Sequence, residues 1–324
     1  MQKKEGNLIL FPKWKENLEK ESMLALKEKR YIDALPKLNQ LLRFNVDHYE
    51  IITGKLICLM ELGEYDDAQI LCEELLKVKD ENYYQYMHIY LTLLFQTNQF
   101  DILLEQIDIE LSENTIPTII AEQFQQLYQM SKQMKSDLMT ERSVKYTEEL
   151  EISIQNQDHV RQWQLVENLR KMKINPMESI ITYLKDESIH PVVKTAIFKW
   201  LQDKGIADPI HISKLNLHLT IRPIDVKDIR QHTITKQVML QISELEQKNP
   251  TLYILFEQLF YRYAYVRFPI MPPDTDVENL SKALRVIGNE YLQIQNDEQK
   301  NIEANKYIEE IKMCEHLYLS IIEE

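Results

Sequence analysis

Glycine is scarce in this 324-residue sequence, which contains only five glycines, with no two close together. A dinucleotide-binding turn and a phosphate-binding loop both need clustered glycines, because the backbone must approach phosphate closely. The scarcity therefore argues against both motifs, and we expect no cofactor. No proline stands between Pro36 and Pro117, and Leu, Ile, Lys, Glu and Gln are abundant, which favours helix over strand.

Cysteines and long apolar runs are also scarce. The three cysteines, Cys58, Cys72 and Cys314, lack metal-ligand spacing and are expected to be buried free thiols in a reducing compartment. The apolar run after the N-terminal lysines, "NLILF", is too short for a signal peptide, and no run is long enough to cross a bilayer. We therefore expect a cytoplasmic protein.

Motifs for catalysis and metal binding are missing as well. The eight histidines do not cluster with other ligands, so no metal site is expected. Neither H-E-x-x-H, G-x-S-x-G nor C-x-x-C occurs, so we assign no catalytic residue.

Basic residues are few in the middle of the chain. Residues 46–157 hold seven Lys and Arg against 21 Asp and Glu, whereas the whole chain has a net charge of −13. Such an acidic segment repels nucleic-acid phosphates and anionic lipid head groups. It indicates either a solvated surface that keeps the protein soluble or a surface that selects a basic peptide or protein. We expect no nucleic acid and no membrane among the partners.

A repeat of 34 residues is the strongest pattern present. The stretch "YIDALPKLNQLL", beginning at Tyr31, returns as "YDDAQILCEELL", beginning at Tyr65, and Ala34 matches Ala68. A third, offset copy begins at Phe100. We interpret each copy as a helix pair in which the aromatic residue fills the gap between two helices. Each pair leaves an apolar side uncovered, so successive pairs must stack.

These residues resemble the tetratricopeptide repeat family. The family pattern of glycine, aromatic residue and alanine before a second helix is matched by Gly63, Tyr65 and Ala68. Lys29 replaces the glycine in the first unit, and Leu103 replaces the alanine in the third. The resemblance covers residues 15–112 and implies a helical solenoid that binds proteins.

The sequence predicts an all-α fold, in which a tetratricopeptide-type helical solenoid precedes a helical C-terminal domain with one small β-hairpin. The segment "HPVVKTAIFKWLQDKG" resembles one helix of a HEAT-type repeat. The whole layout resembles cytoplasmic Firmicute tetratricopeptide repeat proteins, a likeness that implies no activity. We expect these parts: an N-terminal tail, 1–14; three repeat units plus a capping helix, 15–135; a connection, helical or looser, 136–157; and the C-terminal domain, 158–324.

The hairpin is predicted near residues 210–222, where the alternation of apolar residues changes parity. We place a two-residue turn at Ser213-Lys214, with Ile212 opposite Leu215 and Ile210 opposite Leu217. A lone hairpin is marginal in water, and Leu8 to Phe11 is a candidate third strand.

Aromatic residues are dense between Tyr253 and Phe268, interleaved with Arg262 and Arg267. Stacking on nucleic-acid bases is one interpretation. The spacing covers most of a helix circumference, which favours a buried central helix. We therefore expect both arginines to pair with carboxylates of the acidic final helices.

The resemblance also implies which residues face a partner, because the first helix of each repeat lines an inner groove. Methionines and an apolar strip bordered by charge suit an amphipathic or extended peptide. The alternative is that another part of this chain fills the groove. A carboxylate at position 19 argues against capture of an acidic C-terminal tail. The candidate groove residues are Glu19, Met23, Leu26, Glu50, Ile57, Met60, His88, Thr92 and Phe95.

The sequence thus predicts a non-enzymatic scaffold or adaptor that binds a peptide or protein segment, with a preference for basic partners. Two alternatives stay open. One is a peptide-sensing regulator, although no helix-turn-helix with a basic recognition face is visible. The other is a hydrolase whose catalytic residues follow no known motif.

Overall fold

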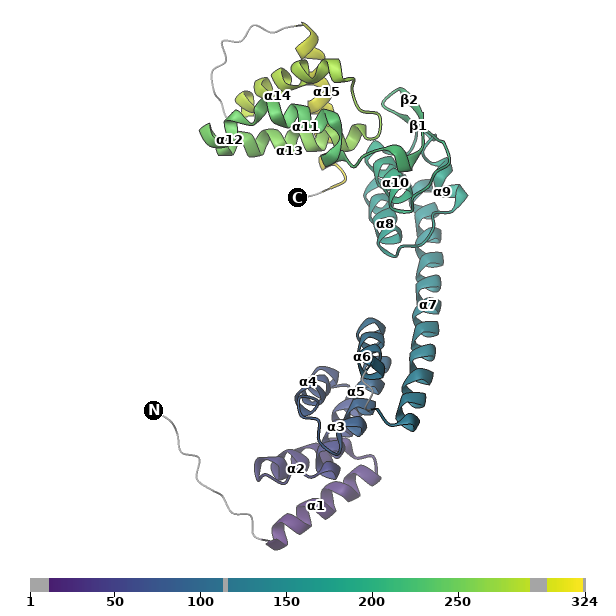
Figure 1. Cartoon of the computed structure of the whole chain (residues 1–324), viewed down its shortest axis with the longest axis vertical. Helices are drawn as coiled ribbons and strands as arrows, with labels where there is room; N and C mark the ends of the chain where they lie inside the picture. Colours follow the sequence, from purple (N-terminus) through teal and green to yellow (C-terminus); the bar gives the residue numbers. More distant parts are fainter. Residues whose placement is uncertain (1–11, 113–115, 292–301, 323–324) are drawn as a thin grey trace. The chain divides into compact units, whose positions relative to one another are not determined.

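The computed structural model describes residues 12–112, 116–291 and 302–322, and in these the chain is helical with one two-stranded antiparallel sheet (Figure 1). The predicted all-α class is confirmed. The chain divides into two compact units, Met1–Leu138 and Met139–Glu324, which we call unit 1 and unit 2. The first described helix begins at Pro12, and most of the predicted tail lies outside the described residues.

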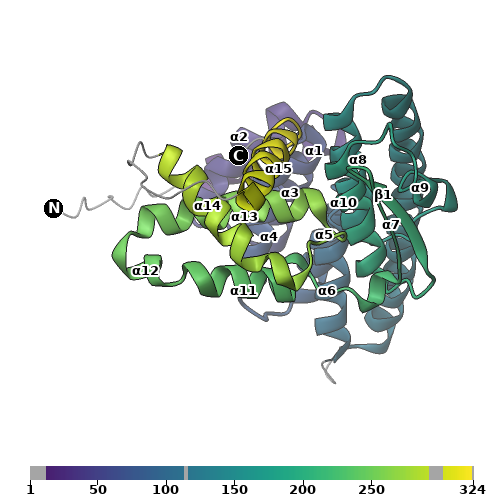
Figure 2. The same ribbon diagram turned by 90° about the horizontal axis from the view of Figure 1, so that it is seen from above.

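Unit 1 contains three helix pairs joined by short turns (Figures 1 and 2). Each helix packs against the next one along the chain. Ala34 and Ala68 are fully buried between the two helices of their pairs, so the small side chain allows the close approach that the repeat predicts. The pairs are α1 (Pro12–Lys27) with α2 (Tyr31–Arg43), α3 (Tyr49–Leu62) with α4 (Tyr65–Leu75), and α5 (Tyr83–Gln96) with α6 (Phe100–Ser112).

The first helix of each pair ends in the same way. Lys29, Gly63 and Asn98 all have a positive φ, of 57°, 79° and 56°. In each turn the next residue donates its backbone N–H to a carbonyl five residues earlier, as Glu64 does to Leu59 at 2.9 Å. This is a Schellman cap, which glycine favours but other residues tolerate at some cost. The lysine at position 29 therefore preserves the repeat geometry.

Helix α7 (Thr118–Gln155) is continuous. It contains the predicted capping segment and nearly all of the predicted connection at 136–157. The two compact units divide within it, between Leu138 and Met139. In unit 1 the start of α7 buries Phe124 against the third repeat pair, and in unit 2 its end buries Leu150.

Unit 2 is built around two buried helices, α10 (Pro191–Asp203) and α13 (Pro250–Arg267). Helices α14 and α15 lie along α13 (Figure 2), and Phe256, Phe260 and Tyr263 are almost fully buried there. The aromatic series is thus core, as predicted. The remaining elements are α8 (His159–Lys171), α9 (Glu178–Thr182), η1 (Pro223–Asp225), η2 (Ile229–Gln231), α11 (Thr233–Ile242), α12 (Glu244–Lys248), η3 (Asp274–Asp276), α14 (Val277–Tyr291) and α15 (Ile302–Leu319).

The two arginines of α13 pair as expected. Arg262 Nη1 lies 2.7 Å from Glu315 Oε1, with both side chains about nine-tenths buried. Arg267 pairs with Glu310 of the same final helix. A charge on a buried helix needs such a partner, because desolvation without one is expensive.

The hairpin exists, but its predicted register was wrong. Strands β1 (Ile210–Lys214) and β2 (Leu217–Ile221) pair Ile212 with Leu219 and Ile210 with Ile221. The turn is therefore Leu215-Asn216, whose φ values of 50° and 60° are those of a type I′ turn, which asparagine favours. Leu215 and Leu217 do not face Ile212 and Ile210. The candidate third strand lies outside the described residues.

The turn was predicted one residue pair too early because Lys214 was expected to be exposed in it. In the structure this lysine is buried at the end of β1. Its Nζ donates to Thr195 Oγ1 at 2.5 Å, to the Val266 carbonyl at 2.9 Å and to the Phe268 carbonyl at 2.6 Å. These three oxygens match the three donors of an ammonium group. Burial nevertheless lowers the pKa of Lys214 well below its ordinary value. The side chain anchors the hairpin to α10 and to the end of α13.

His190 caps α10 in a manner that depends on pH. Its Nδ1 accepts a hydrogen bond from the Val192 backbone N–H at 3.3 Å, so the ring must be neutral. Burial, followed by the charges of His159 and Lys214, lowers the pKa of His190 from 6.5 to about 4. The unfolded chain therefore binds a proton first as the pH falls below 6.5, and stability is lost progressively between pH 6.5 and pH 4.

A His190→Asn substitution keeps a capping acceptor that does not titrate. We expect the loss of unfolding free energy between pH 7 and pH 5 to be smaller in this variant by about 1 kcal/mol, after allowance for partial exposure of the ring. Urea titrations at the two pH values measure the free energy of unfolding of the variant and of the wild type. His316→Asn, at an exposed position of the same unit, is the control. If His190→Asn and wild type lost the same free energy of unfolding on acidification, the pH-dependent capping role of His190 would be contradicted.

Candidate functional site

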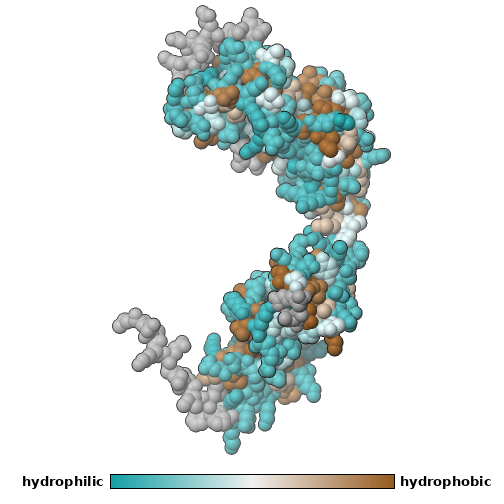
Figure 3. Space-filling model, viewed as in Figure 1, coloured by the Kyte–Doolittle hydropathy of each residue, from teal (hydrophilic) through white to brown (hydrophobic). Residues whose placement is uncertain are grey.

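The candidate site is the face of unit 1 formed by the first helices of the three pairs, α1, α3 and α5. Three of the predicted residues are exposed on it: Glu50, Ile57 and His88. Ile57, in the middle of α3, is 42% exposed. Figure 3 shows that hydrophobic residues reach the surface of unit 1 as small patches within a mostly hydrophilic surface.

The apolar row predicted for the groove is partly involved in packing between helices of unit 1. Leu26, Met60 and Phe95 are all half-buried. Leu26 Cδ1 would lie 2.8 Å from a Cβ atom added to Gly54, so Leu26 packs directly on the backbone of α3. The Phe95 ring meets Phe100 edge-on, with centroids 5.6 Å apart. These residues are therefore less accessible to a partner than Ile57 is.

Glu19, Met23 and Thr92 are also half-buried and have partners within unit 1. The Glu19 carboxylate lies 3.7 Å from Lys15 Nζ and 3.9 Å from His48 Nε2. The Thr92 hydroxyl donates to the His88 carbonyl at 2.8 Å, and Met23 packs against a hydrophobic cluster built from α1, α2 and α3. Their availability to a ligand is correspondingly smaller than that of Ile57.

The structure adds a hollow of about 350 Å³ beside His88, between α3, α5 and the start of α7. Two tyrosines, one from α3 and one from α5, line it. Of the residues that line it, His88 is one of the candidate groove residues predicted from the sequence. The dense aromatic run in α5 could have indicated this hollow from the sequence. The lining residues that α7 contributes could not, because they are distant in sequence from α3 and α5. We call this feature the tyrosine hollow; it is lined by Tyr49, Tyr84, Gln85, His88, Ile89, Ile120, Gln123 and Phe124.

The electrostatic setting of the hollow is negative. The Tyr86 ring lies 5.6 Å from that of Tyr49, centroid to centroid. Burial, followed by the charges of Asp80 and other nearby groups that include Asp47 and Glu50, raises the pKa of Tyr86 to about 12. Burial disfavours any charge, but the part of the shift that comes from the carboxylates favours a cation nearby. Tyrosine faces bind cations as well, so the hollow can accept a lysine or arginine side chain.

The cysteine thiols of α3 and α4 have low reactivity. Burial raises the pKa of Cys58 to about 11 and that of Cys72 to about 12, so neither forms a thiolate readily. Within the described ranges no three His, Cys, Asp or Glu side chains converge as metal ligands. The described helices also include none with the length and apolarity needed to cross a membrane.

Comparison with known proteins agrees with this architecture. Residues 25–88 match the tetratricopeptide repeat family. A TPR repeat-containing protein of Bacillus subtilis (strain 168), YsoA, is 31% identical over 294 residues, which cover 89% of this chain and 87% of that protein. Sperm-associated antigen 1 of Mus musculus is 34% identical over 65 residues, 20% of this chain and 7% of that protein. The chain therefore belongs to the tetratricopeptide repeat proteins, whose repeats are protein–protein interaction modules.

Proposed function

We propose that unit 1 is a non-enzymatic adaptor that binds a segment of another protein along its inner face. By inner face we mean Glu50, Ile57 and His88 together with the tyrosine hollow. The observation that carries the proposal is that helix α3 contributes both the exposed Ile57 and Tyr49, a wall of the tyrosine hollow. A concave hollow and an exposed apolar side chain on one helix give a partner two separate points of contact.

The geometry of α3 suggests how a bound segment is spaced. Tyr49 and Ile57 stand eight residues apart on this helix, which corresponds to roughly 12 Å along its axis. An extended chain covers that distance in about four residues. A fitting segment therefore carries a lysine or arginine for the tyrosine hollow and an apolar residue for Ile57, separated by about four positions.

Charge supplies the preference for a basic segment. Neither Glu50 nor Asp47 forms an ion pair among the described residues, and the surrounding residues 46–157 are strongly acidic. Such a field raises the association rate of a cationic partner and weakens as salt screens it. Apolar contact at Ile57 then contributes the part of the affinity that salt leaves unchanged.

Two synthetic peptides test this function on the full chain. One has an arginine four residues before a leucine in an otherwise neutral extended sequence, and the other has glutamate in place of the arginine. Fluorescence anisotropy should show binding of the arginine peptide that strengthens at low salt, and at least tenfold weaker binding of the glutamate peptide. Equal affinity of the two peptides would contradict the proposal.

A further inference from the structure

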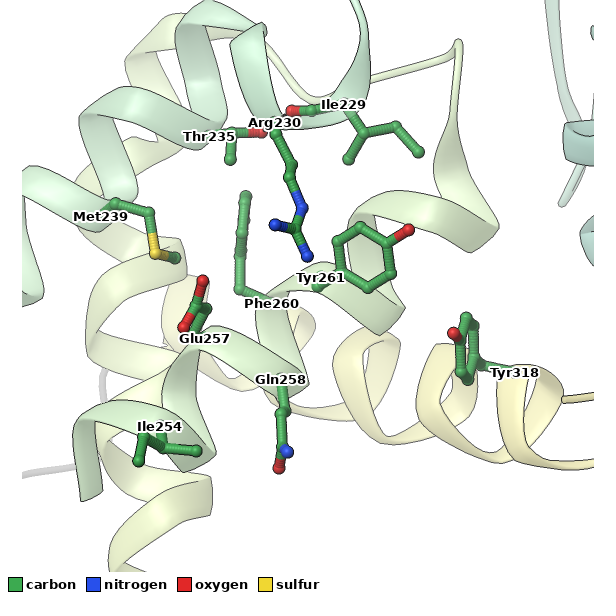
Figure 4. Close-up of a pocket in the computed structure, with 10 residues that line it drawn as sticks. All are labelled: Ile229, Arg230, Thr235, Met239, Ile254, Glu257, Gln258, Phe260, Tyr261 and Tyr318. Atoms are coloured by element: carbon green, nitrogen blue, oxygen red, sulfur yellow. Dashed lines mark hydrogen bonds between the residues drawn. The ribbon is translucent and has the colours of Figure 1, made fainter. Parts of the chain in front are cut away.

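Unit 2 contains a cavity of about 390 Å³ that the interaction module in unit 1 does not use. Residues of η2, α11, α13 and the final helix α15 line it (Figure 4). Its size is near the lower end of cavities that hold small molecules, and too small for a folded partner. We call it the C-terminal pocket.

The apolar part of the C-terminal pocket is rigid. Ile229 and Phe260 are each 1% exposed and belong to the core of unit 2. The Tyr261 ring is braced by Tyr265, at a centroid distance of 6.1 Å, and by Tyr318, edge-on at 6.4 Å. A wall fixed by its neighbours loses little freedom when a ligand binds, which favours affinity.

Two charged side chains of opposite sign enter the same pocket without pairing. The Arg230 guanidinium lies 5.5 Å above the Tyr261 ring and forms no ion pair with any described carboxylate. Its neighbour Asp228 is engaged by Lys199 at 3.3 Å. Glu257 likewise has no cationic partner among the described residues. In Figure 4 the Phe260 ring lies between Arg230 and Glu257.

We propose that the C-terminal pocket binds a short peptide of dipeptide size with free ends. The peptide carboxylate pairs with Arg230, which can hold it with two parallel hydrogen bonds. The peptide ammonium pairs with Glu257, and its apolar side chains pack against the accessible Met239 and Ile254. A charge at each end separated by apolar surface matches the cation, the aromatic ring and the anion of the pocket in order.

Calorimetry on the full chain at pH 7 tests this assignment with Leu-Leu as the probe. We expect Leu-Leu to bind at least tenfold more tightly than N-acetyl-Leu-Leu, than Leu-Leu amide and than free leucine. The Arg230→Gln variant should bind Leu-Leu and its amide equally, and Glu257→Gln should bind Leu-Leu and its acetylated form equally. Glu246→Gln, an exposed carboxylate of α12 outside the pocket, should behave as wild type.

Three results would overturn the assignment. One is no heat of binding for Leu-Leu at millimolar concentration. Another is free leucine binding as tightly as Leu-Leu, because the two charges of the pocket would then not require a dipeptide. The last is retention of the full preference for free ends in both neutral variants. Arg230 and Glu257 are exposed side chains, so circular dichroism should show that both variants fold.

Discussion

Gly288→Ala should destabilise unit 2 by about 2 kcal/mol, although alanine normally stabilises a helix by up to about 1 kcal/mol relative to glycine. Gly288 lies in α14 and is fully enclosed. A Cβ atom at this position would stand 2.0 Å from Cε1 and 2.8 Å from Cδ1 of the Phe256 ring. Because Phe256 is itself fully buried, the ring has no free space to move into, and overpacking outweighs the gain in helix propensity.

Urea unfolding followed by tryptophan fluorescence measures this effect, since Trp163 and Trp200 both lie in unit 2. Phe256→Leu makes room for the new methyl group, so it should cost less in the Gly288→Ala background than in wild type. Glu290→Ala, on the exposed side of the same helix, should stay within about 1 kcal/mol of wild type. A stabilised Gly288→Ala variant would show that α13 and α14 do not pack as described.

Glu315→Ala should have a larger effect than Gly288→Ala, a loss of about 3–5 kcal/mol in the free energy of unfolding. The Glu315 carboxylate bonds Arg262 at 2.7 Å and accepts the Tyr291 hydroxyl at 2.6 Å. The hydrogen bond to Glu315 and burial together raise the pKa of Tyr291 to about 12, so the tyrosine stays a donor. Removal of the carboxylate takes away the buried charge that faces the Arg262 guanidinium and the acceptor of the Tyr291 hydroxyl.

The double variant Arg262→Met/Glu315→Leu separates charge from packing. Replacing a buried ion pair by apolar residues is often neutral or stabilising, so we expect the double variant to recover most of the lost stability. The same urea titration provides the comparison. A loss below about 1 kcal/mol for Glu315→Ala alone would mean that water reaches the pair.

Local pattern predicted the helix pairs of unit 1 well. Ala68 is fully buried within its helix pair, and a short window of sequence contains this determinant. The gap-filling role predicted for the aromatic residue was wrong for Tyr65, which is 41% exposed, whereas its counterpart Phe100 is buried. The pairing of the two arginines of α13 was also predictable. An arginine on a buried helix requires a carboxylate partner, whichever element of the fold supplies it.

Features that depend on distant contacts were not predictable in this way. The hairpin turn was misplaced because Lys214 looks like a turn residue, whereas its acceptors come from Val266 and Phe268, more than 50 residues away. The register of the groove positions followed from the repeat, but the exposure of Leu26 and Phe95 depends on how closely neighbouring helices stack. The C-terminal pocket combines residues of η2, α11, α13 and α15, which no local pattern brings together.

The most direct test of the adaptor compares two isoleucine substitutions in one helix pair. Ile57 lies on the inner face of α3, and Ile70 lies on α4 and is 56% exposed. At either position a glutamate side chain would remain largely exposed to solvent. We expect Ile57→Glu to weaken binding of the arginine peptide at least tenfold, whereas Ile70→Glu binds it as wild type does. Unchanged affinity in Ile57→Glu, or an equal loss in Ile70→Glu, would contradict binding at the inner face.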